Sequence, residues 1–291
     1  MTGAWQARRA EVARQVQARL ECATGLYDGP VAEAMAYAGA GGKRLRALLV
    51  MEGARLHAQP DARAVWPAAA IEALHAYSLV HDDLPCMDDD DLRRGQPTVH
   101  RKWDEATAVL AGDALQALAF ELVCDPACHP DGAVRADLAL SLARAAGAGG
   151  MVRGQALDIA AETAPAPLTL AQITDLQNGK TGALITWAAC AGPRMAGDDL
   201  TGLQTYGDAL GLAFQIADDI LDVEGSASAV GKAVGKDAAA GKATFVSLLG
   251  LDGAKRRADD LVSQACDALS VYGAGADCLR QTARFVIARD N

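Results

Sequence analysis

Residues 81–95 carry the densest concentration of chemically useful side chains in the chain. They read HDDLPCMDDDDLRRG, with six aspartates between Asp82 and Asp91 and two arginines close behind. A run of like charges is often only a solvated face, but this run follows the apolar stretch IEALHAYSLV at the end of a helical pattern. Because a helix C-terminus disfavours anions, the carboxylates need a compensating cation. The ligand order of a calcium EF-hand is absent, whereas Mg²⁺ takes one or two carboxylates, several waters and phosphate oxygens. The cluster therefore predicts a magnesium site for a phosphorylated substrate.

Pro85 indicates how the carboxylates of this cluster could converge. On an unbroken helix Asp82 and Asp88 would lie about 120° apart, at about 100° per residue. Proline lacks a backbone N–H, so we expect the helix to end or kink there. That break is required if both aspartates are to bind one metal ion.

Residues 211–223 (GLAFQIADDILDV) form a second acidic cluster, which is cleaner than the first. On a helix, one arc of about 100° holds four polar side chains: Gln215, Asp218, Asp219 and Asp222. Every other side chain from Leu212 to Val223 is apolar, and the polar arc contains no lysine or arginine. This arrangement again favours metal binding over an ordinary surface face.

Basic residues that could hold anions directly occur in GGKRLR at residues 41–46. The two glycines allow close approach of the backbone, and Lys43 and Arg46 would share a helical face if a helix starts here. The chain as a whole is acidic, with a formal net charge of −10, which argues against a nucleic-acid partner.

The elements that must position these residues are predicted to be helices. Apolar residues recur at three- and four-residue spacing in residues 11–23, 67–84, 104–124, 131–147, 168–177 and 211–223, and no long segment alternates with period two. Breaks are expected at residues 39–42, 59–61, 125–126, 130–132, 165–167 and 192–193. The sequence predicts a single all-α domain over residues 1–291, a bundle of about ten or more helices around a central cavity.

The sequence also indicates the cellular compartment in which the protein is expected. The first twenty residues contain scattered charges and no apolar core of a signal peptide, and no uncharged apolar run reaches 18 residues. We therefore expect a cytoplasmic protein without stable membrane association. Seven cysteines without a CxxC pair are expected to be reduced thiols.

Five segments in this order resemble the trans-prenyltransferases, the short-chain isoprenyl diphosphate synthases, and most closely the bacterial farnesyl diphosphate synthases. They are GGKRLR at 41–46, YSLVHDDLPCMDDDDLRRGQPTVH at 77–100, GKTGALI at 179–185, FQIADDILD at 214–222 and GKAT at 241–244. The resemblance covers essentially the whole chain, and the aspartate pair DDxxxxD and DDxxD with the intervening KTG is highly specific. Departures at Ala47, Arg153 and Asn178-Gly179 bear on local loop geometry.

The resemblance implies a role for each motif. Magnesium ions, three with bound diphosphate, would be held by Asp82 and Asp88 opposed by Asp218 and Asp222, with help from Asp83 and Asp219. The allylic diphosphate would contact Arg93, Lys180, Lys232 and Lys242. Isopentenyl diphosphate would bind Lys43, Arg46, His75 and Arg94. The oxygens of Thr181 and Gln215 would face the developing cation.

The implied reaction is transfer of a prenyl group. An allylic diphosphate (dimethylallyl or geranyl) ionises, isopentenyl diphosphate attacks C1, and pyrophosphate is released, with farnesyl diphosphate as the expected product. Tyr77, five residues before Asp82 and about 7.5 Å along a helix, would stop chain growth. The Gly- and Ala-rich residues 224–242 would close on the diphosphate. The family also suggests a homodimer.

The motifs are also compatible with other interpretations. A synthase stopping at C10 or C20 would carry the same motifs. A terpene cyclase would share the fold and one acidic motif, but would not need Lys43 and Arg46 for a second diphosphate. A non-catalytic subunit of a heteromeric synthase could lose the acidic motifs, and both are intact here.

Overall fold

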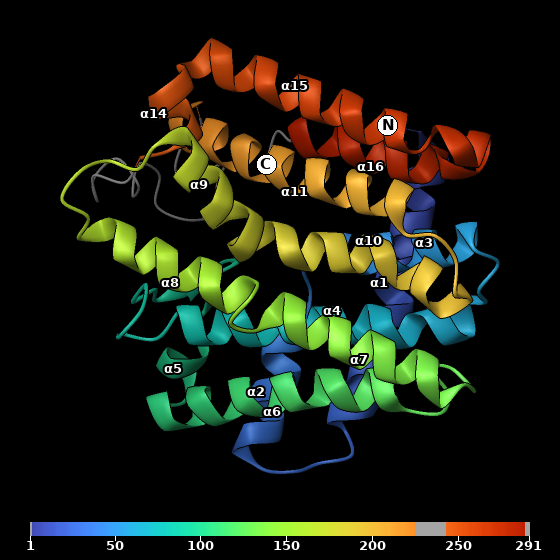
Figure 1. Cartoon of the computed structure of the whole chain (residues 1–291). Coiled ribbons are helices and arrows are strands. Elements are labelled where there is room, and N and C mark those ends of the chain that lie inside the picture. The colour runs from blue at the N-terminus through green and yellow to red at the C-terminus, as the bar shows by residue number, and fades with distance from the viewer. Residues whose placement is uncertain (1, 225–242, 289–291) are drawn as a thin grey trace. The chain divides into compact units, whose positions relative to one another are not determined.

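The computed structural model describes residues 2–224 and 243–288. These residues form more than ten α-helices, and their only strands are two of two residues each (Figure 1). The predicted all-α class is confirmed. The small hairpin, in which β1 (Leu92–Arg93) pairs antiparallel with β2 (Gln96–Pro97), lies in the loop that follows the first acidic cluster.

The chain divides into two compact units. The N-terminal unit contains residues 2–139 and 191–198, with α1 (Gly3–Thr24), α2 (Pro30–Gly39), α3 (Leu45–Leu56), α4 (Asp61–Asp82), the hairpin, α5 (Val99–Lys102) and α6 (Glu105–Cys124). The C-terminal unit contains the described parts of 140–190 and 199–288, with α8 (Met151–Glu162), α9 (Leu170–Gln177), the π-helical turn η1 (Asn178–Gly182), α11 (Thr201–Glu224), α14 (Phe245–Leu249), α15 (Leu251–Ala268), the 3₁₀ segment η2 (Ser270–Ala276) and α16 (Asp277–Ile287). Two helices, α7 (Gly132–Ala146) and α10 (Ala183–Ala196), contribute residues to both. The single-domain expectation stays a prediction.

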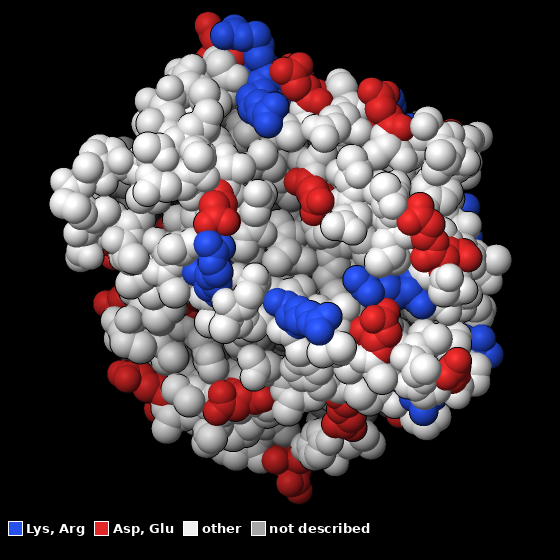
Figure 2. Space-filling view, in the orientation of Figure 1, with Lys and Arg blue, Asp and Glu red and all other residues white. Residues whose placement is uncertain are grey.

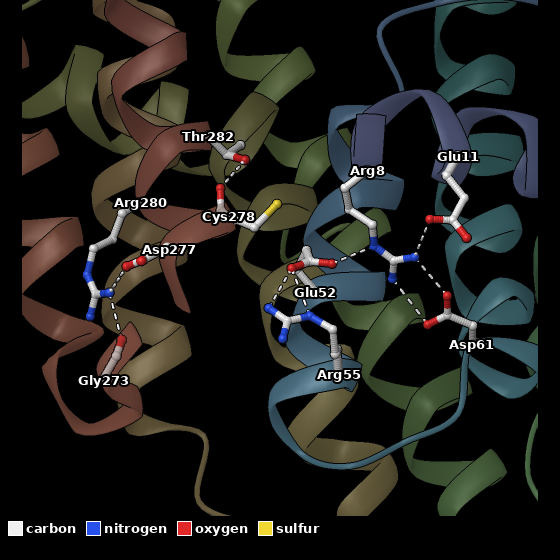
Figure 3. A network of polar contacts seen from close by, with 10 residues as sticks. All are labelled: Arg8, Glu11, Glu52, Arg55, Asp61, Gly273, Asp277, Cys278, Arg280 and Thr282. Carbon is white, nitrogen blue, oxygen red and sulfur yellow. Dashed lines mark hydrogen bonds and ion pairs between the residues drawn. The ribbon is translucent and has the colours of Figure 1, made fainter. Parts of the chain in front are cut away.

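In the N-terminal unit, α4 packs along α6 and against α3. Fully buried Leu48, Met51, Ile71 and Leu115 form its apolar core. At the far end of α3, the Arg8 guanidinium of α1 donates to Glu52 at 2.8 Å and bidentately to Asp61 (Figure 3). These ion pairs tie α1, α3 and α4 together.

In the C-terminal unit, α11 lies beside α15. The fully buried Tyr206 of α11 donates its hydroxyl to the Leu279 carbonyl of α16 at 2.9 Å. Arg280 on α16 donates to Asp277 and to the Gly273 carbonyl (Figure 3). The Tyr206 bond thus joins α16 to the helix that carries the second acidic cluster, whereas the Arg280 bonds hold the turn between η2 and α16.

One predicted break is wrong. Residues 192–193 (Gly-Pro) lie inside α10. A Cβ at Gly192 would stand 2.2 Å from the Gly53 carbonyl carbon, so the glycine serves close packing against α3. That packing outweighs the loss of one helical hydrogen bond at Pro193. The other predicted breaks fall between helices or at their ends.

Three further features of the structure are the state of the thiols, the distribution of surface charge and the apolar helix α6. All seven cysteines are free. Acidic and basic side chains are interspersed on the face seen in Figure 2. Within the described residues, only α6 is long and apolar enough to cross a membrane, and packing against α4 gives an ordinary reason for that composition.

Candidate active site

The first acidic cluster begins where α4 ends. The helix stops at Asp82, before Pro85, as predicted. The chain then turns back, so that the Asp88 backbone N–H donates to the Asp82 carbonyl at 2.8 Å. The break therefore brings the backbone groups of Asp82 and Asp88 within hydrogen-bond distance of each other.

Asp83 and Arg93 form an ion pair with several hydrogen bonds in this cluster. The Arg93 Nε lies 2.7 and 2.9 Å from the two Asp83 carboxylate oxygens, and its Nη2 also donates to Oδ1. Asp83 is only 3% exposed. Burial raises the pKa of Asp83, and the hydrogen bonds from Arg93 oppose that rise. Asp83 is thus engaged with the protein, while Asp82 is half-buried and Asp88 exposed.

Three of the four residues expected to bind isopentenyl diphosphate lie within one electrostatic neighbourhood. His75 is on α4, and its pKa is held well below the usual range by burial and then by nearby positive charge, with Arg46 and Arg94 the leading cations. Gly42 approaches the Arg94 guanidinium so closely that a Cβ there would stand 2.9 Å from Nη2. A neutral imidazole among arginines makes a setting suited to an anion.

The expected helical face of Lys43 and Arg46 is not formed. The helix α3 begins at Leu45, after Arg44 in a left-handed conformation (φ 51°), so Lys43 precedes the helix. Gly41 and Gly42 also have positive φ, which glycine adopts without strain. The two cations therefore lie on either side of a sharp turn.

Tyr77 is buried on α4 against α6. Its ring meets His81 edge-on at a centroid distance of 5.7 Å. Burial raises the pKa of the Tyr77 hydroxyl, which also hydrogen-bonds to Gln116 of α6. His81 in turn contacts the Val109 carbonyl at 3.0 Å.

In the C-terminal unit, the KTG motif occupies the π-helical turn η1. Glycines fix this turn: a Cβ at Gly154 of α8 would lie 2.0 Å from the Lys180 nitrogen, and one at Gly211 of α11 would lie 2.8 Å from the Gly182 Cα. The unusual Asn178-Gly179 starts the turn, with Gly179 facing Gly154 closely. π-Turns occur often at functional sites.

A chain of hydrogen bonds links η1 to α11 and α14. The Thr181 hydroxyl donates to the Gln215 Oε1 at 3.2 Å, and the Gln215 Nε2 donates to Asp219 at 3.3 Å. Asp219, 6% exposed, also accepts from the Phe245 backbone N–H at 2.8 Å. The Thr181 hydroxyl uses its proton in the bond to Gln215. The lone pairs of the Thr181 oxygen are therefore the part that could face a cation.

Two residues that neighbour predicted site residues, one in each unit, were not themselves predicted. Asp158 of α8 accepts from Lys180 Nζ at 2.7 Å, and Arg44 is buried within the GGKRLR segment. Neither residue carries a local signal in the sequence, because their partners come from other helices. The predicted Lys232 and Lys242, and residues 225–242 of the expected closing segment, lie outside the described residues.

The donor set fits magnesium. Within residues 2–224 and 243–288 no three His, Cys, Asp or Glu side chains form a ready metal cluster. Mg²⁺ needs fewer protein ligands than that, since water and substrate phosphates complete its octahedron. Half-buried Asp82 in the N-terminal unit, and half-buried Asp218 and Asp222 in the C-terminal unit, carry the kind of oxygen ligand that Mg²⁺ prefers.

Comparison with known proteins bears on the family of the chain. The polyprenyl synthetase profile matches residues 30–270. Farnesyl diphosphate synthase of Escherichia coli K12 is 45% identical over 264 residues, 88% of this chain and 87% of that protein. Geranylgeranyl pyrophosphate synthase 9 of Arabidopsis thaliana is 44% identical over 233 residues, 78% of this chain and 64% of that protein.

Solved structures show the same relationship. An FPP/GFPP synthase from Zymomonas mobilis matches with a TM-score of 0.90 and 45% identity, covering 98% of this chain and 100% of that one. A geranyltransferase from Helicobacter pylori, complexed with magnesium and isoprenyl diphosphate, matches with a TM-score of 0.79 and 32% identity over 97% and 96% of the two chains. The chain belongs to the polyprenyl synthetase family, and the predicted resemblance is confirmed.

Proposed function

We propose that this chain is a magnesium-dependent farnesyl diphosphate synthase, which joins dimethylallyl or geranyl diphosphate to isopentenyl diphosphate and releases pyrophosphate. The observation that carries the proposal is 45% identity to a farnesyl diphosphate synthase over 88% of the chain, with both aspartate motifs intact. A relative named geranylgeranyl pyrophosphate synthase is 44% identical, so product length is the property to measure.

We assign the metal ligands as Asp82 and Asp88 in the N-terminal unit and Asp218 and Asp222 in the C-terminal unit. When bound there, magnesium would neutralise the charge of the departing pyrophosphate. Asp83 and Asp219, which are buried against protein donors, would hold the other carboxylates in place rather than bind metal directly.

The remaining site residues would stabilise charge on the substrates or hold the substrates in position. Arg93 and Lys180, with Lys232 and Lys242, would share the negative charge of the allylic diphosphate as its C1–O bond breaks. The Thr181 oxygen would face the resulting allylic cation, held in orientation by Gln215. Lys43, Arg46, His75 and Arg94 would hold isopentenyl diphosphate so that its double bond attacks C1. The proton lost afterwards would pass to pyrophosphate, so no protein base is required.

Each unit contains one carboxylate–cation pair that substrate binding would have to accommodate. Lys180 is bonded to Asp158, and Arg93 to Asp83. Each cation has further N–H groups, so both could keep these partners while contacting phosphate. Pre-paired cations hold their positions before substrate arrives, which reduces the ordering cost of binding.

Homodimer formation and a cytoplasmic location complete the proposal. On α6, Val109 is 41% and Leu110 53% exposed, which leaves apolar surface for a second copy to cover. Seven free thiols suit a reducing compartment.

The test is incubation with magnesium, isopentenyl diphosphate and either dimethylallyl or geranyl diphosphate, with product length read by chromatography. We expect a C15 product from both starters and none after chelation. A C10 or C20 end product would change the assignment within the family, and absence of any condensation would refute it.

A further inference from the structure

Arg44 is a buried cation inside the segment that carries Lys43 and Arg46. It is 5% exposed, although its neighbours in the sequence reach the surface. Its Nη1 donates to Glu72 at 3.2 Å, and its Nη2 donates to Gln17 at 2.7 Å and to the Gly39 carbonyl. One guanidinium therefore joins α1, the end of α2 and α4. Burying a cation without partners is costly, so Arg44 depends on these three hydrogen bonds.

Glu72 connects this arginine to two other parts of the neighbourhood. Its second oxygen accepts the backbone N–H of Ala47 at 3.0 Å, so the same carboxylate holds Arg44 and the first turn of α3. Glu72 also precedes His75 by three residues on α4, which places both on one helical face. The loop, the start of α3 and the helix carrying His75 are thus fixed by one ion pair.

The backbone between α2 and α3 is held at two consecutive carbonyls by two arginines. Arg44 donates to the Gly39 carbonyl, and Arg94 donates to the Ala40 carbonyl at 3.1 Å. Arg44 itself is in the left-handed conformation, which a residue with a Cβ adopts at a cost. The side-chain bonds of Arg44 offset that cost and fix the turn that separates Lys43 from Arg46.

We propose that Arg44 and Glu72 form a positioning pair for isopentenyl diphosphate: neither touches the substrate, but together they set the relative positions of Lys43, Arg46 and His75. The inference rests on the proposed function, since it assumes that those three residues bind this diphosphate. It assigns the buried ion pair to substrate recognition in addition to stability.

The first test is Arg44→Lys. A lysine keeps the charge, but a single ammonium group does not reproduce the fork of a guanidinium with three partners. We expect the KM for isopentenyl diphosphate to rise about 10- to 100-fold, the loss typical of displaced binding groups, with the KM for geranyl diphosphate unchanged. Calorimetric titration of the folded variant with isopentenyl diphosphate should show the same loss of affinity.

A matched control lies at the other end of α3. Arg8 forms comparable ion pairs with Glu52 and Asp61 (Figure 3). Glu52 lies about two turns, or about 10.5 Å, along the helix from Leu45, where α3 begins. Arg8→Lys should lower the melting temperature without changing the KM for isopentenyl diphosphate.

A double variant separates positioning from stability. Arg44→Gln with Glu72→Gln removes both charges, so no unpaired ion remains buried and the melting temperature should recover above that of Glu72→Gln alone. The raised KM should persist. Recovery of stability and KM together, or a wild-type KM in Arg44→Lys, would overturn the inference. If the wild-type protein condensed no substrate at all, the proposed function would fall, and this inference with it.

Discussion

The two aspartate pairs, Asp82-Asp83 and Asp218-Asp219, share a division between their members. In each pair the second aspartate is buried and bonded to protein donors: Asp83 to Arg93, and Asp219 to the Phe245 N–H. The first aspartate of each pair is half-buried. Sequence spacing predicted all four carboxylates as part of the metal site but not this difference in burial, because burial depends on residues distant in the chain.

Substituting the members of the first pair should therefore give different phenotypes. Asp82→Asn should lower kcat by more than about 100-fold, because it removes a proposed metal ligand. Asp83→Asn should lower the free energy of unfolding by about 1–3 kcal/mol, because it weakens a buried charged hydrogen bond. Urea titration and steady-state kinetics measure the two effects. A wild-type kcat in Asp82→Asn, or a wild-type free energy of unfolding in Asp83→Asn, would contradict the division.

Tyr77 shows how far a single residue could be interpreted from sequence. Its position five residues before Asp82 predicted a role in stopping chain growth, although an ideal helix puts the two about 140° apart. The structure adds that the ring contacts His81 and that its hydroxyl bonds to Gln116. Helical periodicity could not supply the contact with α6, because it arises only when the two helices pack.

Tyr77→Ala should yield products longer than C15, since it removes the ring that we propose ends the path of the growing tail. Tyr77→Phe is the matched control, because it keeps the ring and removes only the hydroxyl that bonds to Gln116, so it should still make C15. Chromatography of the products from geranyl and isopentenyl diphosphates measures both. An unchanged C15 product from Tyr77→Ala would exclude Tyr77 as the stop.

At the scale of elements, the long periodic helices were predictable and the irregular turns were not. The stop of α4 before Pro85 and the helix around residues 211–223 follow from local chemistry. The π-turn at Asn178–Gly182 and the left-handed Arg44 do not, since close backbone contacts and distant ion pairs impose them. The break expected at residues 192–193 was wrong for the same reason: packing of Gly192 on α3 overrode local propensity.

Gly154→Ala tests whether the contact between α8 and η1 positions the KTG motif. The new Cβ would lie 2.0 Å from the Lys180 nitrogen, a backbone atom that moves only if the turn moves. We expect a loss of about 1–3 kcal/mol in the free energy of unfolding and a lower kcat as Lys180 and Thr181 shift. Gly132→Ala is the control, because its nearest neighbour is a flexible arginine at 3.6 Å, and it should stay within about 0.5 kcal/mol of wild type. A wild-type kcat in Gly154→Ala would show that displacing the turn does not disturb the positions of Lys180 and Thr181.

For the molecule as a whole, the sequence predicted the helical class and the family, both of which are confirmed. Periodicity alone could not predict the division into two compact units, which depends on how helices from separate parts of the chain pack. Each unit carries one acidic motif, so a function that needs both motifs depends on the intact chain. Homodimer formation, which we propose for the whole molecule, was suggested by the sequence only through its family.

The exposed apolar residues of α6 provide a way to test the dimer. Leu110 is 53% exposed on a helix that is otherwise apolar enough to resemble a membrane span, so covering it with a second copy would remove apolar surface from water. Leu110→Glu would place a charge in that interface, and we expect light scattering to give the mass of one chain instead of two. Val271→Glu is the control, because Val271 is 79% exposed in η2 of the other unit, and its variant should keep the wild-type mass. A Leu110→Glu protein with the mass of two chains would place the interface elsewhere, and a wild-type protein with the mass of one would remove the dimer from the proposal.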